Sequence, residues 1–239
     1  MSHKSRWGKA LNGAGSDAAD PDPALLPGPI TSVREMRRRV GRYVVEVAGV
    51  GISPVSVEMI AEFQLTVACT LDGPTLDNVL AASRSVACYD RALETLARRS
   101  RSTRDLERWL ADRGFSSAEI GPALGRLTTL GVLDDLAFAR GFAQTRMVGR
   151  GFGWRRVAAE LGRHGVASGI VATVLSELSE RRGGGEEEAL LAAAERRAKA
   201  LQKLAPDVAR RRLVGWLVRR GFAPGEAGAA VRRLFPGRQ

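Results

Sequence analysis

The stretch that decides the fold is LTTLGVLDDLAFARGFAQTRMVGRGFGWRRVAAELGR, residues Leu127–Arg163. Gly131 follows an apolar run and predicts the end of a helix, and a second, glycine-rich break (GRGFG) comes later. Between the two breaks, apolar residues recur at helical spacing, which predicts an amphipathic helix over 136–148. Asp134 or Asp135 is placed to cap its first turn. We therefore expect the end of one helix, a turn, a whole helix, a glycine-rich break and the start of a third helix.

The same order of helix, glycine turn and helix occurs three times in the chain. Apolar and glycine positions of the first copy return after 51 and after 107 residues: Leu106, Leu110, Gly114, Phe115, Leu124 and Leu127; Val157, Leu161, Gly165, Val166, Leu175 and Leu178; Leu213, Leu217, Gly221, Phe222, Val231 and Leu234. Each glycine fits the position just after a helix, where φ is often positive. A further helix precedes each copy, over 89–99, 136–148 and 187–204. A three-helix unit used three times predicts an elongated, curved array in which each unit mainly touches its neighbours.

The N-terminal part differs from the repeats. Residues 1–36 are expected to be a disordered tail, because a segment rich in Gly, Ala, Asp and Pro buries too little apolar surface to offset its ordering entropy. Alternation of Tyr43, Val45 and Val47 predicts a strand that turns at the following glycines into a return strand. A short helix over 75–80, capped by its first residue, is expected next. The fold class is thus mainly α, with predicted parts at 1–36 (tail), 37–84 (small β-hairpin and helix segment), 85–133, 134–182 and 183–239 (three-helix repeats).

Composition predicts a soluble, cytoplasmic and basic protein. No apolar run is long enough to cross a bilayer, and the N-terminus does not have the pattern of a signal peptide. The two cysteines and two histidines do not have metal-ligand spacing, and neither a phosphate-binding loop nor a catalytic motif occurs. We therefore expect no enzyme, no metal and no cofactor. The net charge of +11 comes entirely from residues 89–239, since 1–88 hold equal numbers of basic and acidic residues, and this excess favours a polyanion or an acidic protein as partner.

The candidate contact residues are arginines, together with Trp154, which lies between a glycine and two arginines. The arginines are Arg126, Arg140, Arg146, Arg150, Arg155, Arg156 and Arg163 on the central repeat and its joints, and Arg211, Arg212, Arg219 and Arg220 on the last repeat. As a set they do not have enough nearby acids to pair with, which favours a polyanion or an acidic groove. Trp154 fits a core position and a contact surface equally well. His164 is expected to be a polar residue at a helix end.

Residues from roughly 40 to 236 resemble the RecX family, regulators of the RecA recombinase. The most specific part is LGVLDDLAFARGFAQTR, preceded by ERWLADRGF and followed by RRVAAELGRHGV. Its motif residues, which we expect to be mostly structural, are Gly131, Leu133, Asp134, Asp135, Phe138, Ala139 and Phe142, followed by Arg146. The β-bearing segment over 40–80 matches the family more loosely.

The resemblance implies a non-enzymatic protein that lies in the groove of the RecA filament on single-stranded DNA. It implies restraint of ATP hydrolysis, strand exchange and co-protease activity, and so a role in DNA repair, recombination and the SOS response. We expect a monomer that has no membrane partner. The alternative is a non-specific DNA-binding protein with helix-turn-helix-like repeats. Sequence-specific reading is disfavoured, because the segments 116–119, 167–170 and 223–226 carry few of the Arg, Asn or Gln residues that read bases.

Overall fold

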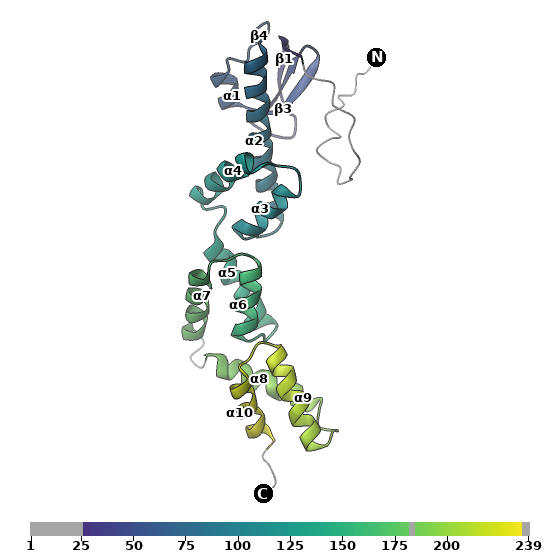
Figure 1. The fold of residues 1–239 in the computed structure, drawn as a ribbon, viewed down its shortest axis with the longest axis vertical. Helices are drawn as coiled ribbons and strands as arrows, with labels where there is room; N and C mark the ends of the chain where they lie inside the picture. Colours follow the sequence, from purple (N-terminus) through teal and green to yellow (C-terminus); the bar gives the residue numbers. More distant parts are fainter. Residues whose placement is uncertain (1–25, 182–184, 236–239) are drawn as a thin grey trace. The chain divides into compact units, whose positions relative to one another are not determined.

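The computed structural model describes residues 26–181 and 185–235, and most of its elements are labelled in Figure 1. The chain divides into two compact units, each described here by itself. Unit 1 comprises the chain up to Thr95 together with Leu110–Arg126. Unit 2 comprises Leu96–Trp109 and the chain from Leu127 onward. None of the helices in the described ranges is long and apolar enough to cross a bilayer.

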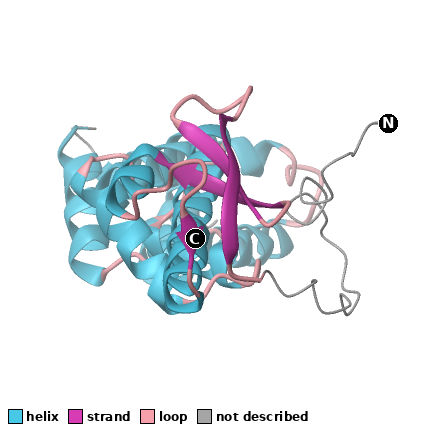
Figure 2. Cartoon of the chain, turned by 90° about the horizontal axis from the view of Figure 1, so that it is seen from above, coloured by secondary structure: helices cyan, strands magenta, loops and turns pink. Residues whose placement is uncertain are grey.

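Unit 1 contains an antiparallel sheet, drawn in magenta in Figure 2, with strand order β3-β2-β1-β4. The bounds are β1 (Gly28–Glu35), β2 (Arg42–Val47), β3 (Val50–Ser56) and β4 (Thr70–Leu71). Strands β2 and β3 form the predicted hairpin, with Val45 opposite Ile52, and its turn contains Gly49 at a φ of +83°.

The predicted tail is wrong where it covers β1. Ile30 is only 1% exposed and pairs with Val47, so this segment does bury apolar surface against the hairpin. The proline and glycines of the sequence around it hid that pattern. Residues 1–25 of the predicted tail lie outside the described residues.

Two helices complete this part of unit 1, α1 (Val57–Glu62) and α2 (Gly73–Arg98). The prediction of a short helix over 75–80 and a separate one over 89–99 is wrong, because both belong to the continuous helix α2. Nothing in the sequence between them breaks a helix, and one buried stripe runs through Leu76, Val79, Ser83, Cys88, Ala92 and Thr95. The cap is not Thr75 but Asp72, whose Oδ1 accepts a hydrogen bond from the backbone N of Thr75 at 2.9 Å.

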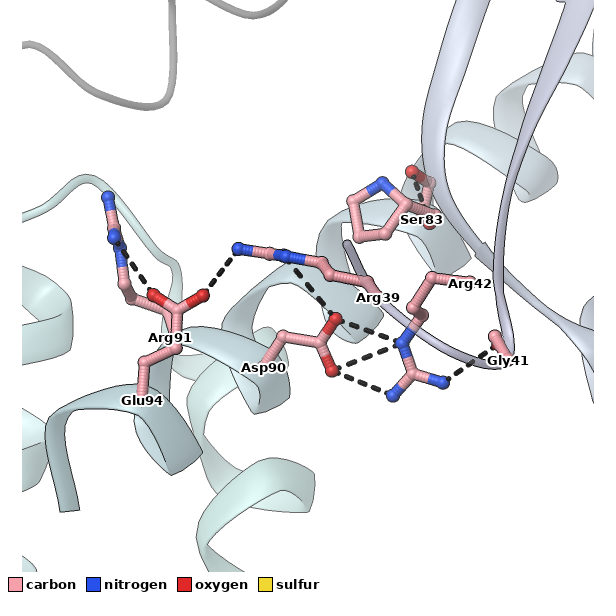
Figure 3. A network of polar contacts seen from close by, with 8 residues as sticks. Arg39, Gly41, Arg42, Ser83, Asp90, Arg91 and Glu94 are labelled. Carbon is pink, nitrogen blue, oxygen red and sulfur yellow. Dashed lines mark hydrogen bonds and ion pairs between the residues drawn. The ribbon is translucent and has the colours of Figure 1, made fainter. Parts of the chain in front are cut away.

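An arginine and an aspartate tie the sheet to α2 (Figure 3). Arg42 of β2 donates to both carboxylate oxygens of Asp90 on α2, over 2.7 to 3.1 Å. The hydrogen bond to Asp90 raises the pKa of Arg42. Arg39 also lies beside Asp90 and bonds to Glu94, which accepts a further bond from Arg91 at 3.2 Å. This network holds the start of β2 and the residues before it against α2.

Two helices cross the division between the units, α3 (Thr103–Ala111) and α4 (Ser117–Thr129). Unit 2 then holds the second repeat, made of α5 (Asp135–Gln144), the π-helical turn η2 (Thr145–Gly149), α6 (Trp154–Arg163) and α7 (Ser168–Arg181). The third repeat consists of α8 (Gly185–Lys199), α9 (Pro206–Arg219) and α10 (Pro224–Leu234). The three helices of each of these repeats pack against one another around a core of their own.

The repeated apolar positions are core positions, as the periodicity predicts. In unit 2, Leu106, Val157, Leu161, Leu213 and Leu217 are completely buried. The predicted helix-ending glycines all have positive φ, namely +80° for Gly114, +76° for Gly165 and +97° for Gly221, with +67° for Gly131. The helix expected over 187–204 begins two residues earlier and ends at Lys199, because turns occupy the segment before Pro206 opens α9.

Candidate functional site

Two adjacent aspartates cap two different helices at the start of the second repeat. The Oδ1 atom of Asp134 accepts hydrogen bonds from the backbone N atoms of Leu136 (2.8 Å) and Ala137 (3.0 Å), so it caps its own helix α5 as predicted. The Oδ1 atom of Asp135 accepts from the backbone N of Thr103 at 2.7 Å and from its Oγ1 at 3.1 Å. Asp135 therefore caps α3, which precedes it in the chain, and joins the start of that helix to the second repeat.

The same cap recurs one repeat later. Glu186, at the start of α8, accepts a hydrogen bond through Oε1 from the backbone N of Trp154, the first residue of α6, at 3.1 Å. Thr103 and Trp154 are 51 residues apart, and so are Asp135 and Glu186, so these contacts occupy equivalent positions. Burial raises the pKa of Glu186, although the hydrogen bond from Trp154 opposes this. We call the contact of α3 with the second repeat the first joint, and the contact of α6 with the third repeat the second joint.

Each joint also packs the helix start against the glycine turn of the next repeat. At the first joint, Ser102 donates through Oγ to the carbonyl oxygen of His164 at 2.5 Å, and Gly165 lies against the side chain of Arg104. At the second joint, the backbone N of Gly153 donates to the carbonyl oxygen of Arg220 at 2.8 Å. The adjoining Gly221 lies against Arg156 in the same way. Both joints therefore bring the start of one helix close to a glycine turn, and at the second joint the two backbones themselves meet.

The motif residues of the second repeat serve this packing. His164 lies at the end of α6, as expected, but it is half-buried and its Nδ1 is 2.5 Å from Oδ2 of Asp105. Its ring meets the rings of Phe138 and Phe142 edge-on, at centroid distances of 5.6 and 5.1 Å. Leu133 and Ala139 are buried in the same unit. These contacts support the structural role that the sequence predicts for the motif.

The second joint carries an arginine–aromatic cluster, which we define as Arg146, Arg156, Arg196, Arg197 and Arg220 around Phe152 and Trp216. The guanidinium of Arg156 lies 3.9 Å from the ring centroid of Phe152, and that of Arg220 lies 4.3 Å from the centroid of Trp216 and 5.4 Å from that of Phe152. Arg197 approaches Trp216 to 5.8 Å, and Arg146 approaches Phe152 to 6.0 Å. Such stacked cations are attracted by the electron-rich ring faces.

Helix α8 supplies two members of this cluster that sequence reasoning missed, Arg196 and Arg197. The guanidiniums of Arg196 and Arg220 converge on the backbone of Gly151, where a Cβ atom would lie 3.3 Å from Nη2 of Arg196 and 3.6 Å from Nη1 of Arg220. Helices α8 and α6 are separated in the sequence by all of α7. The one sequence signal that could have predicted their contact is the acidic residue Glu186, which follows Asp135 after one repeat length.

A single carboxylate balances the cluster. Glu160 lies 3.1 Å from Nε of Arg146 and 2.9 Å from Nε of Arg156. Within the described part of the chain, no carboxylate lies within salt-bridge distance of Arg196, Arg197 or Arg220. Burial, followed by the charges of Arg196, Arg156 and Arg197, lowers the pKa of Arg220. Five guanidiniums thus share one carboxylate.

The expectation that the candidate arginines are unpaired is wrong for several of them. Arg140 forms a two-point ion pair with Glu177, at 2.7 and 2.8 Å, and Arg163 is 4.0 Å from Glu160, which also pairs Arg146 and Arg156. Glu177 is 37 residues from Arg140 in the sequence, which hid that pair, whereas Glu160 lies only four residues from Arg156 and three from Arg163 on α6. The exposed candidate arginines are Arg126, Arg140, Arg150, Arg155, Arg163, Arg211, Arg212 and Arg219.

Two further candidates are not part of the cluster. Arg126 belongs to unit 1, where its guanidinium lies 4.8 Å from the ring centroid of Tyr89. Trp154 is half-buried and packs against the core of the second repeat, with its indole nitrogen shielded from solvent. Of the two interpretations of Trp154, these observations favour a core position over an exposed contact surface.

Three family models match the chain in tandem: the first three-helix domain of RecX over residues 88–127, the second over 134–175 and the third over 185–231. A regulatory protein RecX from Halorhodospira halophila is 41% identical over 97 residues, which cover 41% of this chain and 60% of that protein. A regulatory protein RecX from Pelodictyon phaeoclathratiforme is 33% identical over 147 residues, covering 61% and 88% respectively. The crystal structure of a regulatory protein RecX superposes with a TM-score of 0.69 at 18% identity, over 88% of this chain and 98% of that one, which supports the fold. The three domain matches and the shared regulatory relatives show that the chain belongs to the RecX family.

Proposed function

We propose that the chain regulates the RecA recombinase by binding the RecA filament on single-stranded DNA. In this proposal it restrains ATP hydrolysis, strand exchange and the co-protease activity of the filament, and it acts in DNA repair, recombination and the SOS response. It acts in the cytoplasm as a monomer, without a cofactor. The name regulatory protein, carried by its relatives, supports a regulatory and non-enzymatic role.

The observation that carries the proposal is the repeated joint of unit 2 together with the charge it presents. The same kind of cap and glycine turn holds the start of α3 against the second repeat and the start of α6 against the third. The arginine–aromatic cluster of the second joint then has five guanidiniums, and among the described residues Glu160 is the one carboxylate within salt-bridge distance of them. A filament of protein and DNA offers acidic groups at regular intervals, and an array of linked repeats with unbalanced cations suits such a partner.

The starts of the last helix in each repeat do not favour reading of DNA sequence. They read Ser117-Ala118-Glu119 in α4, Ser168-Gly169-Ile170 in α7 and Pro224-Gly225-Glu226 in α10. Glu119 is buried and receives a hydrogen bond from the backbone N of Ser116 at 2.6 Å, so it caps its own helix. Side chains of these types do not form the two-point contacts that distinguish bases.

The test is a titration of the purified chain into an ATPase assay of RecA on single-stranded DNA. We expect inhibition at amounts well below one chain per RecA protomer, because one regulator would affect several protomers of a polymer. Full ATPase activity at equimolar chain would overturn the proposal. A footprint on one preferred duplex sequence would instead indicate helix-turn-helix-like repeats that read DNA sequence.

The structure also sharpens the choice of charge-reversal variants. Arg140 pairs with Glu177 on α7, and Arg146 pairs with the buried Glu160 on α6, so reversal of either charge would disturb contacts inside the second repeat. Arg150 and Arg155 are exposed, and no described carboxylate lies within salt-bridge distance of them. Arg150→Glu with Arg155→Glu should therefore weaken inhibition of the ATPase while the circular dichroism spectrum stays unchanged. A matched control reverses the exposed pair Arg37 and Arg38 of the β1–β2 loop.

A further inference from the structure

We propose that the arginine–aromatic cluster at the second joint is a phosphate-binding site that takes the phosphodiester backbone of single-stranded nucleic acid without reading its bases. The inference rests on the proposed function, because it assigns the nucleic-acid contact of that function to one place in the chain. It is tested without RecA, so that its failure and the failure of the proposed function are distinguishable.

The first step is a comparison of equivalent positions at the two joints. Asp105 and Arg156 are 51 residues apart and occupy the same place on α3 and α6. His164 and Arg220 each end the helix that precedes the glycine turn. At the first joint the two positions form a hydrogen-bonded Asp–His pair. At the second joint the same two positions hold two arginines, which repel each other.

The surroundings increase that repulsion instead of relieving it. Arg196 and Arg197 add two more cations from α8, and the charges of Arg156, Arg196 and Arg197 all act on Arg220. Glu160 lies within salt-bridge distance of Arg146, Arg156 and, outside the cluster, Arg163, but not of Arg196, Arg197 or Arg220. Like charges gathered at a half-buried place cost free energy unless an anion is supplied. Since the described residues do not supply it, the chemistry of the site calls for an anion from outside.

The second step concerns the hydrogen-bond donors that are available to such an anion. Nη1 of Arg220 donates to the backbone carbonyls of Arg150 and Gly151, and Nε of Arg196 donates to Ala192 within its own helix. The terminal nitrogens of Arg196 and the whole guanidinium of Arg197 have no bond to another described residue, and both side chains are exposed. Guanidinium groups present paired N–H donors that match two oxygens of a phosphate.

The third step decides between the backbone and the bases of the ligand. Single-stranded nucleic acids are usually held by stacking of bases on aromatic rings. Here the rings of Phe152 and Trp216 are already covered by guanidiniums, and Phe152 is only 9% exposed. Bases therefore find little ring surface to stack on in the cluster. A ligand that carries one phosphate charge per nucleotide satisfies the excess of guanidiniums whatever its base sequence.

The experiment measures binding of fluorescein-labelled oligothymidylate to the full chain by anisotropy over a series of salt concentrations. The test variant is Arg196→Gln with Arg197→Gln, because neither side chain bonds across the joint, and its control is Arg37→Gln with Arg38→Gln, which removes the same charge from an exposed loop. The test variant should bind about tenfold more weakly at low salt, and the log–log salt slope should fall by about 1.4, two phosphate contacts at about 0.7 each for a single strand. The control should keep the wild-type slope. Equal slopes for the two variants would overturn the proposal.

Further experiments test which anion binds and whether it binds at the second joint. An oligoadenylate should bind as well as the oligothymidylate, and a strong base preference would contradict recognition through the backbone. Polyglutamate at equal charge should compete poorly; competition equal to that of the oligonucleotide would assign the site to acidic protein instead.

Inorganic pyrophosphate should shift the Nε–Hε resonance of Arg220, and an unmoved resonance would show that phosphate does not reach the cluster. Arg156→Asp with Arg220→His, which installs the pair of the first joint, should abolish the oligonucleotide-dependent shift of the remaining arginine resonances.

Discussion

Replacement of Gly153 by alanine should weaken the second joint because two backbones meet there. A Cβ atom at this position would lie 2.6 Å from the carbonyl carbon and oxygen of Gly221 and 2.7 Å from the backbone N of Phe222. Ordinary contacts begin near 3.4 Å, so the two segments must move apart by nearly an ångström. Overpacking of this kind costs about 1–3 kcal/mol. Part of that cost is the hydrogen bond from Gly153 to the carbonyl oxygen of Arg220, which the movement stretches.

Gly162→Ala is the matched control on the same helix. Gly162 is exposed on α6, and nothing lies within 4 Å of a Cβ atom placed there. Alanine should therefore stabilise α6, by up to about 1 kcal/mol from helix propensity. Both variants replace a glycine by alanine, one within α6 and one at its N-terminal cap. Their predicted effects on stability are opposite in sign.

Amide hydrogen exchange is the suitable assay, because a chain of two units need not unfold in one step. In Gly153→Ala, the amides of residue 153 and Phe222 should exchange about 5–150-fold faster, which converts 1–3 kcal/mol at tenfold per 1.36 kcal/mol. Amides in the sheet of unit 1 should not change. Protection at the joint equal to that of Gly162→Ala would show that the backbones do not touch, and the reasoning about both joints would then be wrong.

Three further predictions concern carboxylates. Asp135→Ala should destabilise the first joint by about 1 kcal/mol through loss of the cap on α3, measured by exchange of the first amides of α3, whereas Asp112→Ala at an exposed position should change little. The pKa of Glu186 is raised in the folded chain, so wild-type stability should increase as the pH falls through that raised pKa toward the unfolded value near 4.5. Glu186→Gln should remove this gain in stability. Identical pH profiles of thermal unfolding for the wild type and the variant would contradict the prediction. Asp90→Asn should lower the free energy of unfolding of unit 1 by about 1–3 kcal/mol in urea, because the side chain is only 12% exposed and Arg42 loses a charged partner, while Asp77→Asn on the exposed face of α2 should stay within about 0.5 kcal/mol.

The sequence predicted those features of the fold that depend on residues close together in the chain, namely the glycine turns and the buried helix faces. The glycine turns follow from backbone freedom, as the positive φ of Gly165 and Gly221 shows, and the buried stripes follow from helical period. β1 was missed because its pairing with β2, not its own composition, makes it a strand. Asp135 looked like half of an ordinary capping pair, since its partner Thr103 lies in another repeat.

The candidate site depended still more on contacts between distant segments. The arginines of the second joint were found singly, but their grouping around Phe152 requires α8 to lie against α6. Counting acids near each arginine in the sequence failed for the same reason, because the partner of Arg140 is Glu177 on α7. Charge along a helical repeat predicts that a partner is acidic, whereas the packing of the repeats decides which cations remain free to meet it.

The two joints indicate how such a chain can separate stability from binding. The cap by Asp135 or Glu186 and the approach of a glycine turn use backbone groups and one carboxylate, and they are present at both joints. The positions of Asp105 and His164 at the first joint, and of Arg156 and Arg220 at the second, lie beside these contacts. The side chains at these positions can therefore change their charge while the backbone contacts remain. The first joint has a hydrogen-bonded aspartate and histidine there, and the second joint has two arginines. If the joints served stability alone, the compensated pair would be favoured at both places. The repelling pair at the second joint is thus the position at which a requirement for binding, and not for folding, is expected to have set the residues.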